Sequence, residues 1–170
     1  MIKATIELTD GRKMNLELLP EYAPISVENF VSLAKSGFYE GLCFHRVIDG
    51  FMIQGGGMKM TEYGLEQKKA PKTIKGEFIQ NGVNNTLHHA PGVLSMARTM
   101  VPDSASSQFF ICVADCGFLD GQYAGFGKIA DEESMKVAVE IGKVETGRID
   151  YFSDVPLEPI VIKSVTVTED

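Results

Sequence analysis

The sequence has no tryptophan, only three cysteines and no apolar run longer than six residues, the longest being 109–114. A membrane-spanning helix needs about 20 apolar residues, and the core of a secretory leader needs about 7 to 15. We therefore expect neither a membrane span nor a leader. The cysteines, Cys43, Cys112 and Cys116, are odd in number and lie within or beside apolar segments. This pattern favours buried, reduced thiols over a disulfide framework, and with them a cytoplasmic protein.

Positive charge is also scarce, because 16 Lys and Arg residues face 23 Asp and Glu residues, for a net charge of -7. An acidic chain repels phosphate backbones and anionic lipid, so we expect no nucleic-acid partner and no membrane partner. The lysine-rich segment 68–75 is interpreted as a solvated loop face. With 170 residues, 44% of them hydrophobic and 23% charged, the composition is that of a globular protein. We expect residues 1–170 to form a single domain.

Alternation of apolar and polar residues predicts strands at both ends of the chain. It runs over 2–8 and 14–18 around an Asp-Gly pair at 10–11, which predicts a β-hairpin with a type I′ turn. Alternation resumes over 160–167 but slips by one residue at 163–164. A β-bulge would produce such a slip.

Two segments have helical spacing of their apolar residues. The first begins at Pro24, a residue suited to the first turn of a helix, and reaches a glycine stop at Gly37. The second follows Asp131, whose side chain can cap the helix, and ends near Gly142 or Val144. We predict one short amphipathic helix in each place.

The middle of the chain contains further short strands. A strand pair is predicted over 43–54, with its turn at an Asp-Gly pair, and single strands are predicted at 92–97 and 108–113. The segment 55–85 is rich in Lys, Glu and Gly, and we interpret it as a long surface loop that could equally hold a short strand near 73–78.

This order of elements limits the fold class. The region 146–156 is rich in turn residues, and the chain has no internal repeats. Many short strands and two helices, without repeated βαβ crossovers, favour a closed antiparallel barrel or a sandwich over a parallel sheet.

Two polar residues stand out inside strand-like sequence. Arg46 and Gln54 lie among Phe, Val, Ile and Met in the segment 44–54. Burying a guanidinium is costly unless it is paired or faces a cleft. On this segment alone, an Arg46 that points to solvent or pairs with Asp49 is as good an interpretation as a functional arginine.

A second segment favours the functional interpretation. Alternation over 108–113 places Gln108, Phe110 and Cys112 on one face of a sheet, with the intervening residues on the other face. Both faces are apolar enough to be covered, and one of them carries a polar amide next to an aromatic ring.

Together these motifs resemble the cyclophilin family of peptidyl-prolyl cis-trans isomerases. The resemblance spans nearly the whole chain except 57–84, and it implies a mainly β fold, a closed eight-stranded antiparallel barrel capped by two α-helices. The matching blocks, in family order, are FHRVIDGFMIQGG (44–56), GVLSMAR (92–98), SSQFFI (106–111), FLDGQYAGFGKI (118–129) and DVPLEPIVIKSVTV (154–167).

The resemblance also implies an activity and a set of site residues. It implies acceleration of rotation about X-Pro bonds in unfolded or flexible chains, with Arg46 as the catalytic arginine beside Gln54 and Phe51. It implies no metal and no cofactor. The partners implied are proline-containing peptides and unfolded polypeptides, bound by a monomer. The substrate-binding residues carried over from the family are Met52, Ala97, Arg98, Gln108, Phe110, Phe118, Leu119 and Tyr123.

Three positions depart from the commonest eukaryotic pattern. Phe118 stands where many members have a tryptophan that donates to cyclosporin, so we expect weakened binding of that drug while isomerisation persists. Tyr123 replaces a histidine at the rim of the pocket, and Arg98 replaces an asparagine that acts mainly through its backbone. In these features the chain looks like the bacterial cytoplasmic members.

Other chemistries fit the sequence less well. Three glycines at 55–57 lack the Gly-Lys-Ser/Thr of a phosphate loop, and close backbone packing explains them better. Ser95 is not in a nucleophile elbow, and the His88-His89 pair has no metal-ligand spacing with the cysteines. A cysteine protease would need a thiol beside a histidine, but the thiols are expected to be packed. The main alternative is a proline-peptide-binding module or a chaperone-like partner that uses the same groove with negligible turnover.

Overall fold

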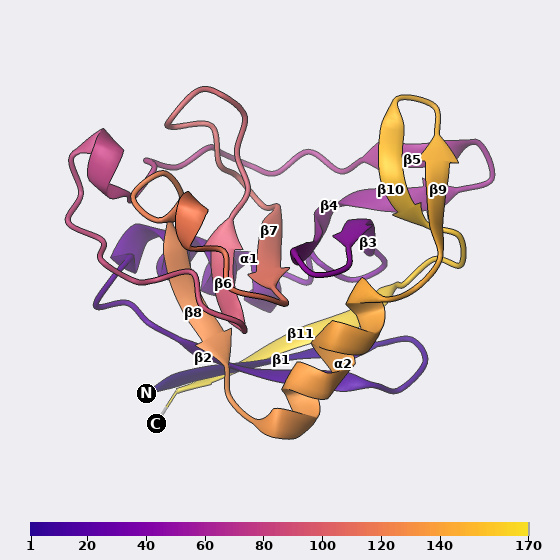
Figure 1. Ribbon diagram of the computed structural model, residues 1–170, viewed down its shortest axis with the longest axis horizontal. Coiled ribbons are helices and arrows are strands. Elements are labelled where there is room, and N and C mark those ends of the chain that lie inside the picture. The colour runs from indigo at the N-terminus through magenta and orange to yellow at the C-terminus, as the bar shows by residue number, and fades with distance from the viewer. Residues whose placement is uncertain (170) are drawn as a thin grey trace.

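The computed structural model describes residues 1–169 as a mainly β structure with two α-helices (Figure 1). The helices are α1 (Pro24–Lys35) and α2 (Glu132–Gly142), with short 3-10 turns η1 (Ile79–Asn81) and η2 (Gly117–Leu119). The strands are β1 (Ile2–Leu8), β2 (Lys13–Leu18), β3 (Cys43–Ile48), β4 (Met52–Thr61), β5 (Gly64–Gln67), β6 (Val93–Met96), β7 (Phe109–Cys112), β8 (Gly125–Ile129), β9 (Thr146–Ile149), β10 (Phe152–Pro156) and β11 (Ile162–Glu169).

Eight of the strands form one antiparallel sheet in the order β11-β1-β2-β8-β6-β7-β4-β3, and β5 pairs with β4 off this path. The sheet curls until its edge strands approach, where Cys43 of β3 forms an isolated bridge with Val161. The Phe44 N–H also donates to the Ile160 carbonyl. The predicted eight-stranded antiparallel fold with two helices is confirmed. The barrel is less closed than predicted, because within residues 1–169 the edge strands are joined by a bridge and a few hydrogen bonds instead of a full ladder.

The first hairpin is confirmed, but its predicted turn type is wrong. Strands β1 and β2 pair in register from Ile2 with Leu18 to Glu7 with Lys13. A type I′ turn needs positive φ at both central residues, and at this turn only Gly11 has it, with φ +94°. The Leu8 N–H donates to the Arg12 carbonyl, which leaves a three-residue loop instead of a two-residue one.

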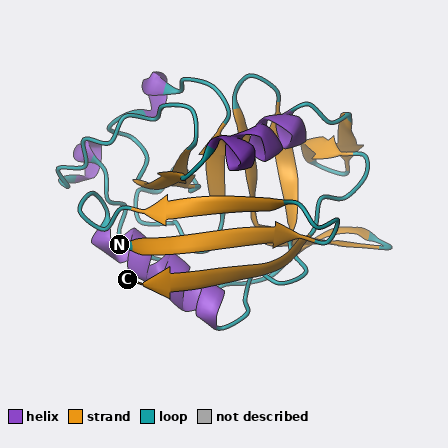
Figure 2. Cartoon of the chain, turned by 90° about the horizontal axis from the view of Figure 1, so that it is seen from below, coloured by secondary structure: helices purple, strands orange, loops and turns teal. Residues whose placement is uncertain are grey.

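Both predicted helices are present, and local signals fix their ends. Gly37, with φ +77°, and Phe38 donate back to the Ala34 and Leu33 carbonyls, which is the Schellman pattern of a helix end. The Asp131 side chain accepts from the Ser134 N–H at 2.8 Å and caps α2. Helix α1 contacts β11 and α2 contacts β2. Figure 2 shows β1, β2 and β11 as long neighbouring strands, with the two termini side by side. No helix in residues 1–169 is long and apolar enough to cross a membrane.

The bulge predicted in the last strand is confirmed. Glu7 of β1 pairs with Ser164 of β11, and the next residue, Leu8, pairs with Ile162, so Lys163 is the extra residue. The region 146–156, which is rich in turn residues and where the sequence pattern predicts no strand, contains the β9–β10 hairpin (Figure 1).

The surface-loop prediction for 55–85 is also wrong in part. Gly55 to Gly57 continue β4, and β5 turns back on it. A Cβ on Gly56 would lie 2.8 Å from the Phe109 ring, so the prediction of close backbone packing is confirmed. Near 73–78 the structure has only an isolated bridge, from Ile74 to Ala105.

The main core contains apolar residues from most strands and from both helices. At its centre the Phe109 ring lies 5.5 Å from Phe30, 5.6 Å from Tyr39 and 6.1 Å from Phe44, centroid to centroid. Its neighbour Phe110 belongs to a separate, smaller cluster, as the alternation along β7 predicts. The three cysteines are buried and free, as expected.

Candidate functional site

A cavity of about 200 Å³ lies on the face of the sheet opposite the main core. It is lined only by residues that the sequence analysis singled out. The lining residues are Arg46, Phe51, Met52, Gln54, Ala97, Arg98, Phe110, Leu119 and Tyr123.

Strand register brings the polar and aromatic parts of this cavity together. Arg46 of β3 is paired with Gln54 of β4, and Gln54 is paired with Phe110 of β7. Paired residues in neighbouring strands project from the same face of a sheet. The three side chains therefore form one row across β3, β4 and β7.

The apolar walls belong to the smaller hydrophobic cluster. Its buried members include Met52, Phe110 and Cys112, and partly buried Leu119 and Tyr123 pack against them. The Tyr123 ring stands edge-on to Phe110, with their centroids 5.7 Å apart. A small apolar ring that entered the cavity would meet a preformed aliphatic and aromatic surface.

The Arg46 guanidinium is partly buried at the wall of the cavity, and its Nη1 lies 3.5 Å from Gln54 Oε1. No carboxylate of residues 1–169 lies within ion-pair distance of it. The alternative interpretations, an ion pair with Asp49 or a side chain turned wholly to solvent, are wrong. Most of its N–H donors remain available to a ligand in the cavity.

Gln108 lies just outside this cavity and is joined to it by one hydrogen bond, from Gln54 Nε2 to Gln108 Oε1 at 3.0 Å. It lines an adjoining polar cavity of about 180 Å³ with Thr99, Ser104 and other residues. Gln54 borders both cavities, so its amide is fixed between them.

Arg98 also borders both cavities, and its side chain is held in place. The guanidinium carbon lies 4.6 Å from the centroid of the Phe78 ring and 4.7 Å from that of Tyr123. Its Nε and Nη2 donate to the Gln122 carbonyl, and its Nη1 donates to the Thr99 carbonyl. Sequence reasoning missed Phe78, because it lies in a segment interpreted as a surface loop and no motif marks it.

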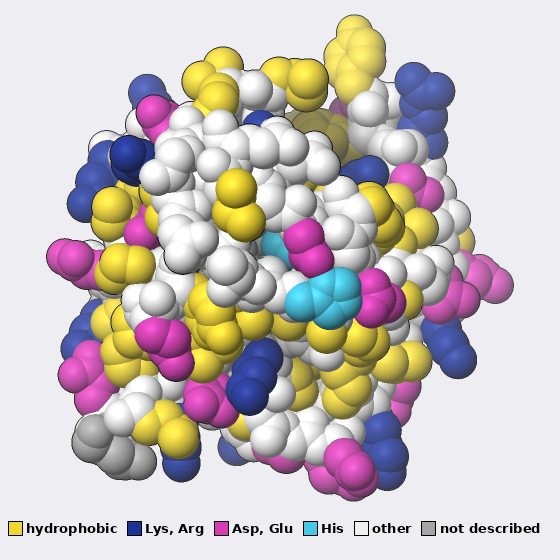
Figure 3. Space-filling view, turned by 60° about the vertical axis from the view of Figure 1, so that its left-hand side comes forward, with side chains coloured by type: hydrophobic (Ala, Val, Ile, Leu, Met, Phe, Trp, Pro, Cys, Tyr) yellow, Lys and Arg dark blue, Asp and Glu magenta, His cyan; other side chains and the backbone are white. Residues whose placement is uncertain are grey.

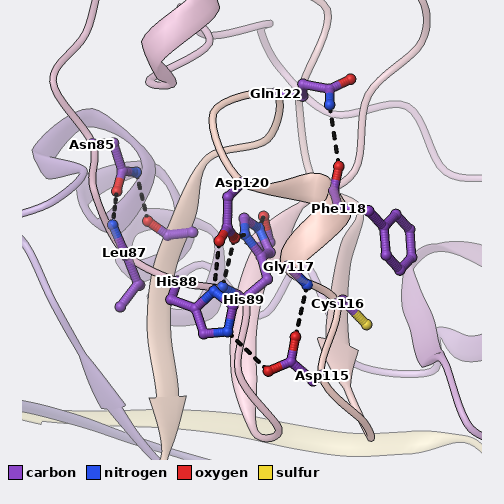
Figure 4. A network of polar contacts seen from close by, with 12 residues as sticks. Asn85, Leu87, His88, His89, Asp115, Cys116, Gly117, Phe118, Asp120 and Gln122 are labelled. Atoms are coloured by element: carbon purple, nitrogen blue, oxygen red, sulfur yellow. Dashed lines mark hydrogen bonds and ion pairs between the residues drawn. The ribbon is translucent and has the colours of Figure 1, made fainter.

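Phe118 lies at the rim and not in the lining. Its side chain is 65% exposed, and its ring centroid is 5.6 Å from that of Phe51. The backbone carbonyl of Phe118 accepts a hydrogen bond from the Gln122 side chain (Figure 4).

His45, the neighbour of Arg46 on β3, is buried and packs edge-on against Phe152 of β10. Its Nδ1 has no hydrogen-bond partner among the described residues. Burial, and after it the charge of Arg46, lowers the pKa of His45 to about 4. The folded state therefore keeps this histidine neutral, whereas the unfolded chain takes up a proton below pH 6.5.

Stability is therefore expected to fall as the pH drops from 6.5 towards 4, with His45 contributing about 2 to 3 kcal/mol of the loss. His45→Leu should remove that contribution and flatten the profile. Urea unfolding of both proteins at neutral and acidic pH measures the difference. Equal losses in the two proteins would contradict the assignment.

The sequence has clear relatives. Residues 3–167 match the family model described as cyclophilin type peptidyl-prolyl cis-trans isomerase/CLD. The chain is 44% identical to the peptidyl-prolyl cis-trans isomerase A of Dickeya dadantii over 164 residues, which cover 94% of this chain and 81% of that protein. It is 43% identical to the peptidyl-prolyl cis-trans isomerase B of Escherichia coli over 162 residues, which cover 91% and 93%.

Solved structures agree with the sequence relatives. The fold is similar to the crystal structure of a cyclophilin type peptidyl-prolyl cis-trans isomerase from Cryptosporidium parvum, determined in the presence of the dipeptide Ala-Pro. The TM-score is 0.77 at 27% identity, and the match covers 99% of each chain.

Proposed function

The chain belongs to the cyclophilin-type peptidyl-prolyl cis-trans isomerases, and on this premise we propose that Arg46 is the catalytic donor and that the 200 Å³ cavity holds the proline ring. One observation carries the proposal: the Arg46 guanidinium, which has no carboxylate of residues 1–169 within ion-pair distance, borders a cavity with aliphatic and aromatic walls. Gln54 and Phe51 act beside Arg46, the first on the peptide backbone and the second as a wall.

The chemistry needs only rotation about one bond. Resonance gives the X-Pro peptide bond a rotational barrier of about 18 to 20 kcal/mol. At the top of the barrier the prolyl nitrogen is pyramidal and carries a localised lone pair, which the planar ground states lack. A donor aimed at that nitrogen stabilises the twisted state selectively, and a guanidinium donates without giving up its proton.

The remaining residues hold the two sides of that bond apart. Met52, Phe110 and Leu119 bind the proline ring, which leaves the acyl group on the other side of the X-Pro bond free to rotate. Gln54 and Gln108 hold the substrate backbone, and the main chain of Ala97 and Arg98 pairs with the peptide beside the cavity. Excluding water from the cavity disfavours the charge-separated planar amide, which lowers the barrier further.

Exchange NMR on a capped Ala-Pro tetrapeptide tests this function. The expected result is faster cis-trans exchange together with shifts of the cavity residues. Binding shifts without faster exchange would instead favour a proline-peptide-binding module and would contradict the proposal.

We propose that residues 1–170 act as one domain and as a monomer. The main core, which includes residues from Ala4 to Val165, supports the single domain. Three buried, free thiols support a reducing location such as the cytoplasm. The physiological partners are then proline-containing segments of unfolded or flexible proteins.

We expect cyclosporin to bind weakly, because Phe118 has no N–H to donate at the exposed rim. Phe118→Trp should supply that donor and raise the affinity about two- to tenfold, which corresponds to one neutral hydrogen bond. Calorimetry measures the change, with Phe118→Leu as the control for ring contact alone. Equal affinity of the tryptophan and leucine variants would contradict the explanation.

A further inference from the structure

Figure 4 shows a polar network that joins His88, His89, Asp115 and Asp120. Its buried member, His89, packs against Phe110, which lines the cavity. The His89 side chain is 1% exposed, and its ring is nearly parallel to that of Phe110, at 19° with the centroids 6.1 Å apart. Its Nε2 lies 2.8 Å from Ser95 Oγ and its Nδ1 lies 2.8 Å from Asp120 Oδ1. The same Asp120 oxygen accepts the His89 backbone N–H at 2.7 Å.

These contacts fix the protonation of the His89 ring. Burial raises the pKa of Asp120, but hydrogen bonds from His88 and His89 outweigh it and hold the pKa below its usual value. A carboxylate only accepts, so His89 Nδ1 carries the proton and Nε2 accepts from the Ser95 hydroxyl. Burial lowers the pKa of His89, so the ring stays neutral. The ring cannot turn without losing bonds at both ends.

Ser95, His89 and Asp120 are connected in the same order as a serine hydrolase triad. That chemistry is ruled out, because the serine is not accessible. Ser95 is 0% exposed and lies in β6, between β7 and β8. A substrate carbonyl cannot reach its hydroxyl. The network therefore has a structural role: it fixes the positions of the Phe110 ring and of the turn that contains Leu119.

The other end of the network reaches the surface. His88 Nδ1 lies 2.5 Å from Asp120 Oδ2, and His88 Nε2 lies 2.9 Å from Asp115 Oδ2. Both ring nitrogens face carboxylates, so both must donate, and His88 is an imidazolium. Figure 3 shows a histidine flanked by acidic side chains on this face. Within residues 1–169 no cluster of three or more His, Cys, Asp or Glu side chains could hold a metal ion.

Asp115 and Asp120 lie at the two ends of a turn that includes Phe118 and Leu119. Asp115 Oδ1 also accepts the Gly117 N–H at 2.9 Å, and the Leu119 N–H donates to the Cys116 carbonyl. One exposed imidazolium thus ties both ends of the turn together, and one buried imidazole ties the turn to Phe110.

We propose that Asp120 is a positioning residue for isomerisation, holding Leu119 through the turn and Phe110 through His89, so that two walls of the proline cavity keep a fixed separation. This rests on the proposed function of the cavity. Because Asp120 does not line the cavity and is bonded to His88 and His89, the proposal concerns binding of the proline ring more than the barrier to rotation.

Asp120→Ala is expected to raise KM and the peptide Kd about tenfold, with kcat changing less than KM. Asp120→Asn should restore most of the affinity, because its side-chain oxygen still accepts from His89. The matched control is Asp131→Ala, which removes a carboxylate bonded to Ser134 and Asn15, neither of which lines the cavity. It should lower Tm and leave KM unchanged.

A pH profile tests the exposed end without a buried substitution. Hydrogen bonds to Asp120 and Asp115 raise the pKa of His88 to about 8, so above that pH it loses one of its two donors. Peptide Kd is expected to rise about twofold between pH 7 and 9. The other groups facing His88 keep their charge over this range: the pKa values of Asp115, Asp120 and His89 are lowered, and burial raises those of the Cys112 and Cys116 thiols.

The decisive measurement is direct titration of each variant with a capped Ala-Pro tetrapeptide, alongside turnover. His88→Asn should remove the rise above pH 8. A normal Kd in Asp120→Ala, or an equal rise in wild type and His88→Asn, would overturn the proposal. Failure of the proposed function would show separately, as equal turnover of the wild type and Arg46→Ala.

Discussion

Arg46→Ala is expected to lower kcat/KM for an X-Pro peptide about 10- to 100-fold, most of it in kcat. A hydrogen bond from a charged donor contributes about 1.5 to 3 kcal/mol net, and each 1.36 kcal/mol is a tenfold change in rate. Because the bond to the prolyl nitrogen forms only in the twisted state, its loss should appear in kcat more than in KM. Protease-coupled assays and exchange NMR measure the two quantities.

Two control variants separate this role from a general effect of charge. Arg46→Lys keeps the charge but loses the planar fork, so it should recover only part of the rate. Arg148→Ala removes an exposed arginine on β9, whose Nε donates to the Asp150 carbonyl, and should leave the rate unchanged. Wild-type turnover in Arg46→Ala would remove the mechanism and leave the binding cavity without a catalytic donor.

The sequence predicts best those elements whose signals are local. Pro24 and Gly37 bracket α1 as expected, and the one-residue slip near Lys163 is a bulge in the structure. The β9–β10 hairpin was missed because its turn uses Asp150 with φ +53°, and an aspartate before Tyr151 carries no turn signal comparable to Asp-Gly. Extension of β4 through 55–57 was missed because glycine runs are rare in strand interiors. Here a Cβ at each of the three positions would collide with a neighbour, namely Phe44, Phe109 or Gln108.

The residues of the site could be predicted only in part from the sequence pattern. Alternation along β7 already placed Phe110 and Gln108 on one face, but family resemblance was needed to join them with Arg46 and Leu119, which lie in distant segments. Contacts made by long side chains were not predictable. The stacking of Arg98 on Phe78 depends on where a segment without a repeating pattern crosses the sheet.

Phe109 and Phe110 provide the sharpest separation of fold from function, because these neighbours on β7 face opposite sides. Phe109→Ala is expected to lower the free energy of unfolding by about 3 to 5 kcal/mol, since it leaves a cavity beside Phe30, Tyr39 and Phe44. Its kcat/KM should stay near the wild-type value once corrected for the folded fraction. Urea unfolding and low-temperature assays give the two numbers.

Phe110→Ala should show the reverse balance. Removing the Phe110 wall of the proline cavity is expected to lower kcat/KM about 30-fold, mostly through KM, because a buried aromatic contact of this kind contributes about 2 kcal/mol. Its cost in stability should be smaller than that of Phe109→Ala, because the ring borders a cavity that is already open on one side. If both variants lost catalysis equally after correction for folding, the two faces of β7 would not be independent. That result would contradict the assignment of this cavity to the proline ring.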